Sequence, residues 1–311
     1  MTMIGTDLMR TATIRLAILG SPTGVYSRQL LDAALKHLRV EPSLHEFDGL
    51  GSSIGPNGWR CTTAEGTELT ACDAVIVRTM PLGTLEQVVF RIDLLHRLQA
   101  AGVRVINSPR SLEIAIDKYL TTAMLAAAGL PVPETIAVQS VDEAMAGFDR
   151  LGQDVVVKPL FGGEGRGLIR LEDPDLAVRA FRTLVQLGAV IYLQRFVRHP
   201  GYDVRILLIG DQAWSIRRIH PTDWRTNVSR GARAERFEPP AEWIELARRA
   251  ASAIDARIVG IDLLPDERGE PLVLEANAVP GWQGLAAAHG IDVAGRVIAR
   301  VVDEVDHDAA G

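Results

Sequence analysis

Short apolar runs alternate with amphipathic segments over the first third of the chain. The apolar runs predict buried strands over 14–20, 74–78 and 103–107. Helical periodicity predicts helices over about 27–38 and 85–101. Strands that alternate with helices indicate βαβ units and therefore a parallel sheet. No G-x-G-x-x-G motif follows the first strand, so we expect a structural or substrate-contacting domain here and no dinucleotide site.

The pattern changes at Ser108-Pro109. A helix capped by Ser111 is expected to carry Asp117-Lys118 and to end before Gly129. Strands and helices continue to residue 195, and the helices are expected at about 141–151 and 173–187. After residue 195 the sequence predicts strands over 203–209 and 212–219, then a helix over 240–254. A hairpin over 258–277 and a helix over about 292–305 complete the chain. We therefore predict an α/β chain in four segments: 1–13, a disordered leader; 14–108, an N-terminal βαβ domain; 109–195, a central subdomain; and 196–311, a C-terminal subdomain.

One predicted strand ends on a lysine, and a glycine-rich loop follows it. The strand is Val155-Val156-Val157-Lys158, and four of the six residues in 162–167, including Gly163 and Gly165, are glycine. Such a loop lets backbone N–H groups approach a ligand closely. The chain has 33 Lys and Arg residues, of which only Lys36, Lys118 and Lys158 are lysine, so a retained lysine favours phosphate binding by a compact charge. The alternative is a hairpin turn beside a lysine whose stem covers apolar surface.

The predicted hairpin over 258–277 carries three oxygen-bearing side chains among apolar neighbours. If its turn centres near Arg268, Asp262 lies opposite Glu275, and Glu275 and Asn277 share one face. Buried acids are costly unless they bind a cation, and hard oxygen ligands suit Mg²⁺. The alternative is a set of isolated polar residues on a solvated face.

The segment from Arg195 to Arg236 contains nine arginines and no lysine. A polar loop within this region contains Trp224-Arg225-Thr226-Asn227. Bidentate recognition of carboxylate or phosphate explains such a cluster. Since the whole chain prefers arginine, an ordinary solvated basic face explains it equally well.

Composition narrows the function classes. The 311 residues are 47% hydrophobic and 23% charged, with a net charge of −6, which gives no reason to expect nucleic acid or an anionic membrane as partner. Two cysteines cannot form a disulfide framework, and no apolar run reaches transmembrane length. We expect a cytoplasmic protein.

The motifs, in this order, resemble the ATP-grasp superfamily and, within it, the RimK-type α-L-glutamate ligases. The resemblance spans nearly the whole chain. It is carried by Asp117-Lys118, Val157-Lys158 with its glycine loop, Gln194-Arg195-Phe196-Val197, Gly201 to Arg205, Arg225-Thr226-Asn227, Gly260-Ile261-Asp262 and Glu275-Ala276-Asn277. It implies a two-subdomain ATP-grasp fold after the N-terminal domain.

The resemblance also implies a role for each motif. Lys118, Lys158 and the glycine lid would bind the ATP phosphates, and Gln194, Arg195 and Phe196 would bind the adenine. Asp203 would bind the ribose, Thr226 would also contact the nucleotide, and Asp262, Glu275 and Asn277 would hold two Mg²⁺ or Mn²⁺ ions. The transferring phosphoryl group would be stabilised by Arg205, Arg218, Arg225 and Asn227. Arg195 departs from the family, in which an acid usually stands at this hinge position.

The expected activity is therefore ATP-dependent carboxylate–amine ligation through an acyl phosphate, with L-glutamate as the amine. We expect the acceptor to be a small-molecule carboxylate such as a tetrahydromethanopterin-type pterin. The sequence leaves open whether the chain forms a homo-oligomer. The alternatives are a ribosomal protein C-terminus, an amino-group carrier protein or, in another class, a non-catalytic ATP-binding regulator. Three retained metal ligands argue against the regulator.

Overall fold

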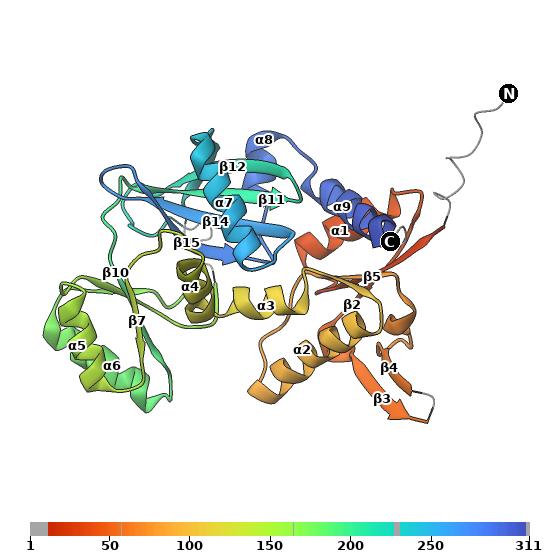
Figure 1. The fold of residues 1–311 in the computed structure, drawn as a ribbon, viewed down its shortest axis with the longest axis horizontal. Coiled ribbons are helices and arrows are strands. Elements are labelled where there is room, and N and C mark those ends of the chain that lie inside the picture. Colours follow the sequence, from red (N-terminus) through yellow and green to blue (C-terminus); the bar gives the residue numbers. More distant parts are fainter. Residues whose placement is uncertain (1–11, 57, 164, 227–230, 309–311) are drawn as a thin grey trace. The chain divides into compact units, whose positions relative to one another are not determined.

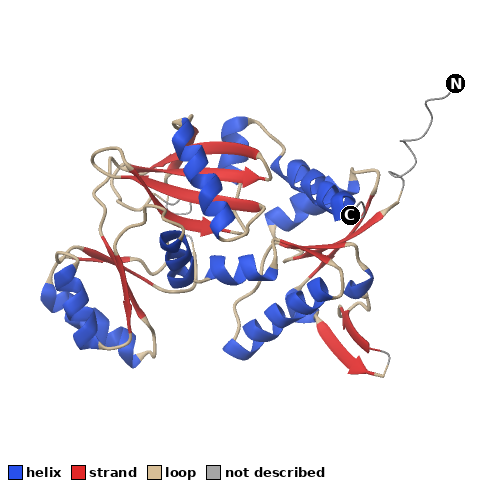
Figure 2. Ribbon diagram, viewed as in Figure 1, coloured by secondary structure: helices blue, strands red, loops and turns tan. Residues whose placement is uncertain are grey.

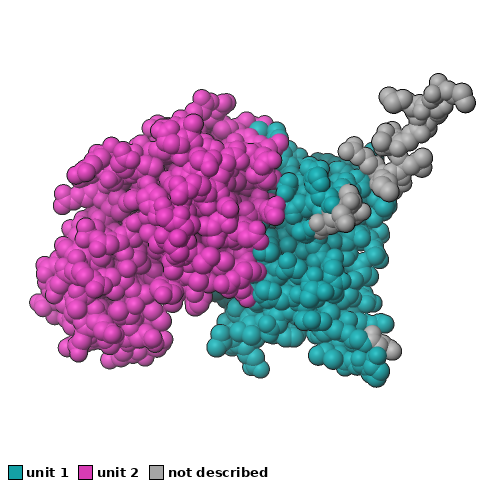
Figure 3. Space-filling model, viewed as in Figure 1, with its two compact units in different colours: residues 1–109, 291–311 teal, residues 110–290 magenta. Residues whose placement is uncertain are grey.

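The computed structural model describes residues 12–56, 58–163, 165–226 and 231–308. The chain forms two compact units, residues 1–109 with 291–311, and residues 110–290 (Figure 3). The terminal segment 291–311 groups with the first unit, whereas the division made from the sequence placed it with 196–311. The boundary between the central and C-terminal segments stays a prediction.

The first unit contains the predicted parallel sheet. Its strand order is β2-β1-β5-β6, and every neighbouring pair is parallel. Helices α1 and α2 lie on opposite faces of the sheet (Figure 1). The right-handed crossover rule leads to this arrangement, because the β1–β2 and β5–β6 connections run in opposite directions across the sheet. Helix α9 packs beside α1. The bounds are β1 Ile14–Leu19, α1 Val25–Leu35, β2 Val40–His45, β5 Ala74–Val77, α2 Leu85–Ala100, β6 Arg104–Ile106 and α9 Val293–Asp308.

Three strands of the first unit were not predicted. The edge strand β2 contains Pro42, which interrupts a strand pattern and is tolerated at a sheet edge because no donor is needed there. The hairpin of β3 (Gly51–Gly55) and β4 (Gly58–Thr62) is mostly exposed, so its sequence lacks the apolar alternation that marks a half-buried strand. Short one-turn helices occur at Phe47–Gly49 and Leu69–Ala71.

The helix expected to begin at Ser111 is two helices, α3 (Pro109–Ile116) and α4 (Lys118–Ala127). Ser111 lies inside α3 and is buried, so it is not a cap. Asp117 ends one helix and caps the next, since its Oδ1 accepts the backbone N–H of Leu120 at 3.0 Å. This break places Lys118 at the start of α4.

The second unit holds two antiparallel sheets. The smaller has the order β7-β10-β8-β9, and α5 and α6 cover one face of it (Figure 2). Phe148 and Phe181, on these two helices, meet edge to face at 6.5 Å in its core. The bounds are β7 Thr135–Val138, α5 Val141–Arg150, β8 Val155–Lys158, β9 Ile169–Leu171, α6 Pro174–Gln186 and β10 Ile191–Arg195.

The larger sheet has the order β13-β12-β11-β14-β15. Alternate residues of β11, such as Val204 and Ile206, pack against α4 and α7, so Asp203 and Arg205 point to the opposite face. Strand β13 and helix α8 were not predicted. The bounds are β11 Tyr202–Ile209, β12 Gln212–Ile219, β13 Arg233–Arg236, α7 Ala241–Ala253, β14 Ile258–Pro265, β15 Pro271–Asn277 and α8 Gln283–His289.

Candidate active site

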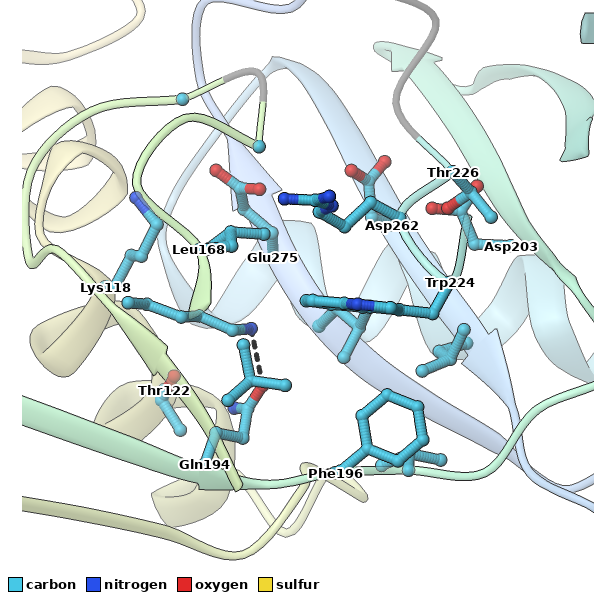
Figure 4. A pocket seen from close by; sticks show the side chains of 18 of the residues that line it. Lys118, Thr122, Leu168, Gln194, Phe196, Asp203, Trp224, Thr226, Asp262 and Glu275 are labelled. Carbon is cyan, nitrogen blue, oxygen red and sulfur yellow. Dashed lines mark hydrogen bonds between the residues drawn. The ribbon is translucent and has the colours of Figure 1, made fainter. Parts of the chain in front are cut away.

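A cavity that is open to solvent lies in the second unit, between residues of the two sheets and their loops (Figure 4). Thirteen residues that the sequence nominated line it: Lys118, Lys158, Gly163, Gly165, Gln194, Arg195, Phe196, Asp203, Arg218, Arg225, Thr226, Asp262 and Glu275. Arg205 and Asn277 do not line it. Asn227 lies outside the described residues.

Two lysines mark one end of the cavity. Lys118 Nζ donates to the carbonyl of Gly162, which ties the start of α4 to the glycine loop. Lys158 Nζ donates to Gln194 Oε1 at 2.5 Å, the bond drawn as a dashed line in Figure 4. Burial lowers the pKa of Lys158 to about 8, with Glu275 opposing and Lys118 reinforcing the effect. An anion bound between the two lysines would raise the pKa of Lys158 again and favour its charged ammonium form.

The glycine loop presents open backbone to this end. Gly162 and Gly165 have φ of 107° and 70°, values that other residues rarely adopt. No atom lies within 4 Å of the position that a Cβ would take on Gly163. The loop therefore has room for phosphate oxygens beside its N–H groups, as an ATP-binding loop requires.

Two arginines and two aspartates form a buried charged row across β12, β11 and β14. Arg218 donates from Nε and a terminal nitrogen to the oxygens of Asp203, at 2.7 and 2.5 Å, and reaches Asp262 at 2.9 Å. Arg205 donates to both oxygens of Asp262 at 2.7 Å. Burial alone would raise the pKa of Asp262, but the two guanidinium groups outweigh it and hold this pKa at about 2. Asp262 is therefore ionised at neutral pH.

Asp262 lies opposite Glu275 in the β14–β15 register, which confirms the predicted pairing. Both carboxylates line the cavity and are labelled side by side in Figure 4. Guanidinium contacts use three of the roughly four lone-pair sites of Asp262, which leaves one for a further partner. Asn277 lies opposite Gly260, and its Oδ1 accepts the N–H of Val279 at 2.9 Å.

This donor set fits a divalent cation that binds phosphate. The carboxyl groups of Asp262 and Glu275 line the same cavity as the lysines, and hard oxygen donors are what Mg²⁺ prefers. In the described ranges no three His, Cys, Asp or Glu side chains converge as a metal cluster, so phosphate oxygens and water would complete the coordination.

The other end of the cavity is aromatic. The rings of Phe196 and Trp224 meet at right angles, 5.7 Å apart, and Arg170 covers the Phe196 ring at 3.6 Å. Arg195 stands at the hinge position where the family usually has an acid, and its side chain forms an ion pair with Glu134 at 2.7 Å. The base-binding role of these residues stays a prediction.

The sequence analysis did not nominate every residue of the cavity wall. Trp224 was noted only as part of a polar loop, and His199 was not among the expected site residues. His199 is half-buried in the cavity wall, where burial lowers its pKa. Neither lies in a recognisable motif. His199 follows β10 and Trp224 follows β12, so only the tertiary structure brings the two residues to one cavity.

No helix in the described part of the chain is both long and apolar enough to cross a membrane.

Comparison with known proteins identifies the fold family. The sequence model of the RimK-like ATP-grasp domain matches residues 115–301. The chain is 34% identical over 255 residues to "Tetrahydromethanopterin:alpha-L-glutamate ligase" of Methanosarcina acetivorans, covering 73% of this chain and 78% of that protein. It is 30% identical over 297 residues to "Probable alpha-L-glutamate ligase" of Haemophilus influenzae, covering 92% and 96%.

A solved structure of the ATP-grasp ligase PsnB, complexed with minimal precursor, Mg and ADP, superposes with a TM-score of 0.70. That match has 24% identity and covers 93% of this chain and 98% of the other, which supports the shared fold. The predicted fold class is thus confirmed, and the chain belongs to the RimK-like ATP-grasp family of ATP-dependent ligases.

Proposed function

We propose that this protein adds L-glutamate to a carboxylate of a tetrahydromethanopterin-type pterin, at the expense of ATP. The acceptor is supported by the relative from Methanosarcina acetivorans, whose name states this reaction. The enzyme class is supported by one observation above all: two of the three lysines of the chain converge on one cavity with the carboxylates of Asp262 and Glu275.

In this proposal the residues at the charged end hold the triphosphate. Lys118 and Lys158 neutralise phosphate oxygens, and the N–H groups around Gly163 bind them from the loop side. Asp262 and Glu275, with Asn277 close by on β15, would hold two magnesium ions. When bound, these ions neutralise the charge that develops on the transferred phosphoryl group.

The reaction needs no nucleophilic side chain. An oxygen of the acceptor carboxylate attacks the γ-phosphorus, the bond to the bridging oxygen breaks, and ADP leaves. The amine of glutamate then attacks the carbonyl carbon of the acyl phosphate, inorganic phosphate departs, and the nitrogen loses a proton as the amide forms. The chain contributes positioning and charge, which supply most of the catalysis in phosphoryl transfer.

The adenine and ribose would occupy the aromatic end. Gln194 to Phe196 would contact the base largely through their backbone. Asp203 is held by Arg218, so its part in ribose binding would involve the oxygen surface that the arginine leaves uncovered.

The test is an ADP-release assay with ATP, Mg²⁺, L-glutamate and the pterin acceptor, followed by mass spectrometry of the product. We expect ADP, phosphate and an acceptor heavier by one glutamyl residue. Turnover only with a ribosomal C-terminal peptide or a carrier protein would reassign the acceptor. Tight ATP binding without turnover on all three acceptors would refute ligase activity and favour the regulator.

A further inference from the structure

The three described arginines that the sequence assigned to the transferring group are not equivalent in the structure. The Arg218 side chain is only 4% exposed and is enclosed by Asp203 and Asp262. Arg205 is bound by both oxygens of Asp262 and does not line the cavity. Both guanidinium groups are therefore paired with buried carboxylates, Arg218 is almost fully enclosed, and Arg205 lies off the cavity wall.

Arg225 is placed differently. It lines the cavity, and its side chain is 24% exposed. Asp223 holds it from one side: Nε donates to Oδ1 and Oδ2 at 3.0 and 3.1 Å, and a terminal nitrogen lies 2.9 Å from Oδ2. A guanidinium has five N–H donors in a rigid fork, and Asp223 engages two of them. Three donors therefore remain for an anion in the cavity.

The loop that carries Arg225 is ordered by its own side chains. Asp223 Oδ1 also accepts the backbone N–H of Arg225 at 2.9 Å, and His220 Nδ1 accepts the N–H of Asp223 at 2.8 Å. The guanidinium carbon of Arg225 lies 5.3 Å from the centre of the Trp224 ring. Asp223 thus fixes both the backbone and the side chain of Arg225. A guanidinium group that is already held in its binding orientation loses less conformational entropy when it binds an anion.

We propose that Asp223 is a positioning residue, which aims the guanidinium of Arg225 at the acceptor carboxylate and at the acyl phosphate formed from it. This inference rests on the proposed function. A carboxylate is the favoured occupant because the two lysines and the glycine loop already supply the phosphate-binding groups of the cavity. A planar fork matches a carboxylate with two parallel hydrogen bonds.

The test is a double-mutant cycle on ligase turnover with saturating ATP and Mg²⁺. Asp223→Asn keeps the size of the side chain and removes its charge. We expect it to lower kcat/KM for the acceptor about tenfold, chiefly through KM, as expected for one charge-assisted hydrogen-bonded pair. When Arg225 is already replaced by lysine, Asp223→Asn should change kcat/KM for the acceptor by less than about twofold, because Asp223 acts through the guanidinium group of Arg225.

Two further variants sharpen the cycle. Asp223→Glu keeps the charge and should recover part of the loss. Glu235→Gln is the matched control, because Glu235 binds Arg217 at 3.0 Å and does not line the cavity. Its kcat/KM should equal that of the wild type.

The inference is overturned if the effects of Asp223→Asn and Arg225→Lys simply add, since Asp223 then acts independently of Arg225. It is also overturned if Asp223→Asn leaves the acceptor KM unchanged and weakens ADP binding instead, measured by calorimetry. These results differ from failure of the proposed function, in which the wild-type protein itself releases no ADP and both proposals fall together.

Discussion

Replacing Asp262 with asparagine tests whether the buried charged row stabilises the fold. The side chains of Asp262 and Arg218 are 6% and 4% exposed, so water screens their interaction weakly. The pKa of Asp262 is about 2, against an ordinary value of 3.8, a difference that corresponds to about 2 kcal/mol of stability at neutral pH. Removing one partner of a buried pair costs about 3–5 kcal/mol, because a charge is left uncompensated. We therefore expect the free energy of unfolding to fall by about 2–5 kcal/mol.

The same change should alter the pH dependence of stability. The pKa of Asp262 is lower in the folded than in the unfolded chain, so its contribution is complete above about pH 4 and disappears as the pH falls towards about 2. Wild-type stability should therefore decrease more steeply over this range than that of Asp262→Asn.

The assay is urea unfolding at pH 7 and at lower pH, followed by circular dichroism. Asp154→Asn is the matched control: Asp154 also binds an arginine with two hydrogen bonds of 2.8 Å, to Arg170, but the pair is about a quarter exposed. The control should lose at most about 1 kcal/mol. Equal losses in the two variants would refute the reasoning that burial makes the Asp262 pairs strong.

Three further predictions concern activity. Glu275→Ala should abolish ADP release and leave the urea midpoint unchanged; normal turnover would remove Glu275 from the metal site. Because the pKa of Lys158 is lowered to about 8, kcat/KM for ATP should fall as the pH rises through 8, and Lys158→Arg should remove this fall, measured in pH–rate profiles. Chelation of Mg²⁺ should stop ADP release, and excess Mg²⁺ should restore it; turnover that persists with chelator would contradict the divalent-cation assignment.

Residues close together along the chain could be placed from the sequence. The run Val155 to Lys158 was predicted as a strand before a glycine loop, and the structure has β8 there. The pairing of Asp262 with Glu275 was predicted from a turn centred near Arg268. The structure has this pairing because a register shift between Asp262 and Leu263 offsets the register next to the turn, where Leu263 lies opposite Val273. Both predictions depend on short-range backbone geometry, which the local sequence specifies.

Local signals failed where several elements compete. Ser111 has the chemistry of a helix cap, yet it is buried inside α3, and Asp117 provides the cap of α4 instead. Strand β2, interrupted by Pro42, forms only because β1 offers it an edge. In these cases tertiary packing decides between local alternatives that differ by about 1 kcal/mol.

The sequence by itself determined the two lysines, the glycine loop and the acidic hairpin, because each is encoded within a short stretch of the chain. It also indicated the parallel sheet, through strands that alternate with helices over 14–107. Only the tertiary structure decided that Arg218 and Arg205 are held by the buried Asp203 and Asp262, whereas Arg225 is held by Asp223 at the cavity wall. The reason is that β11 pairs with both β12 and β14. This pairing brings Arg218 into contact with Asp203, 15 residues away, and Arg205 into contact with Asp262, 57 residues away. The positions of the arginines along the chain do not reveal which strands pair.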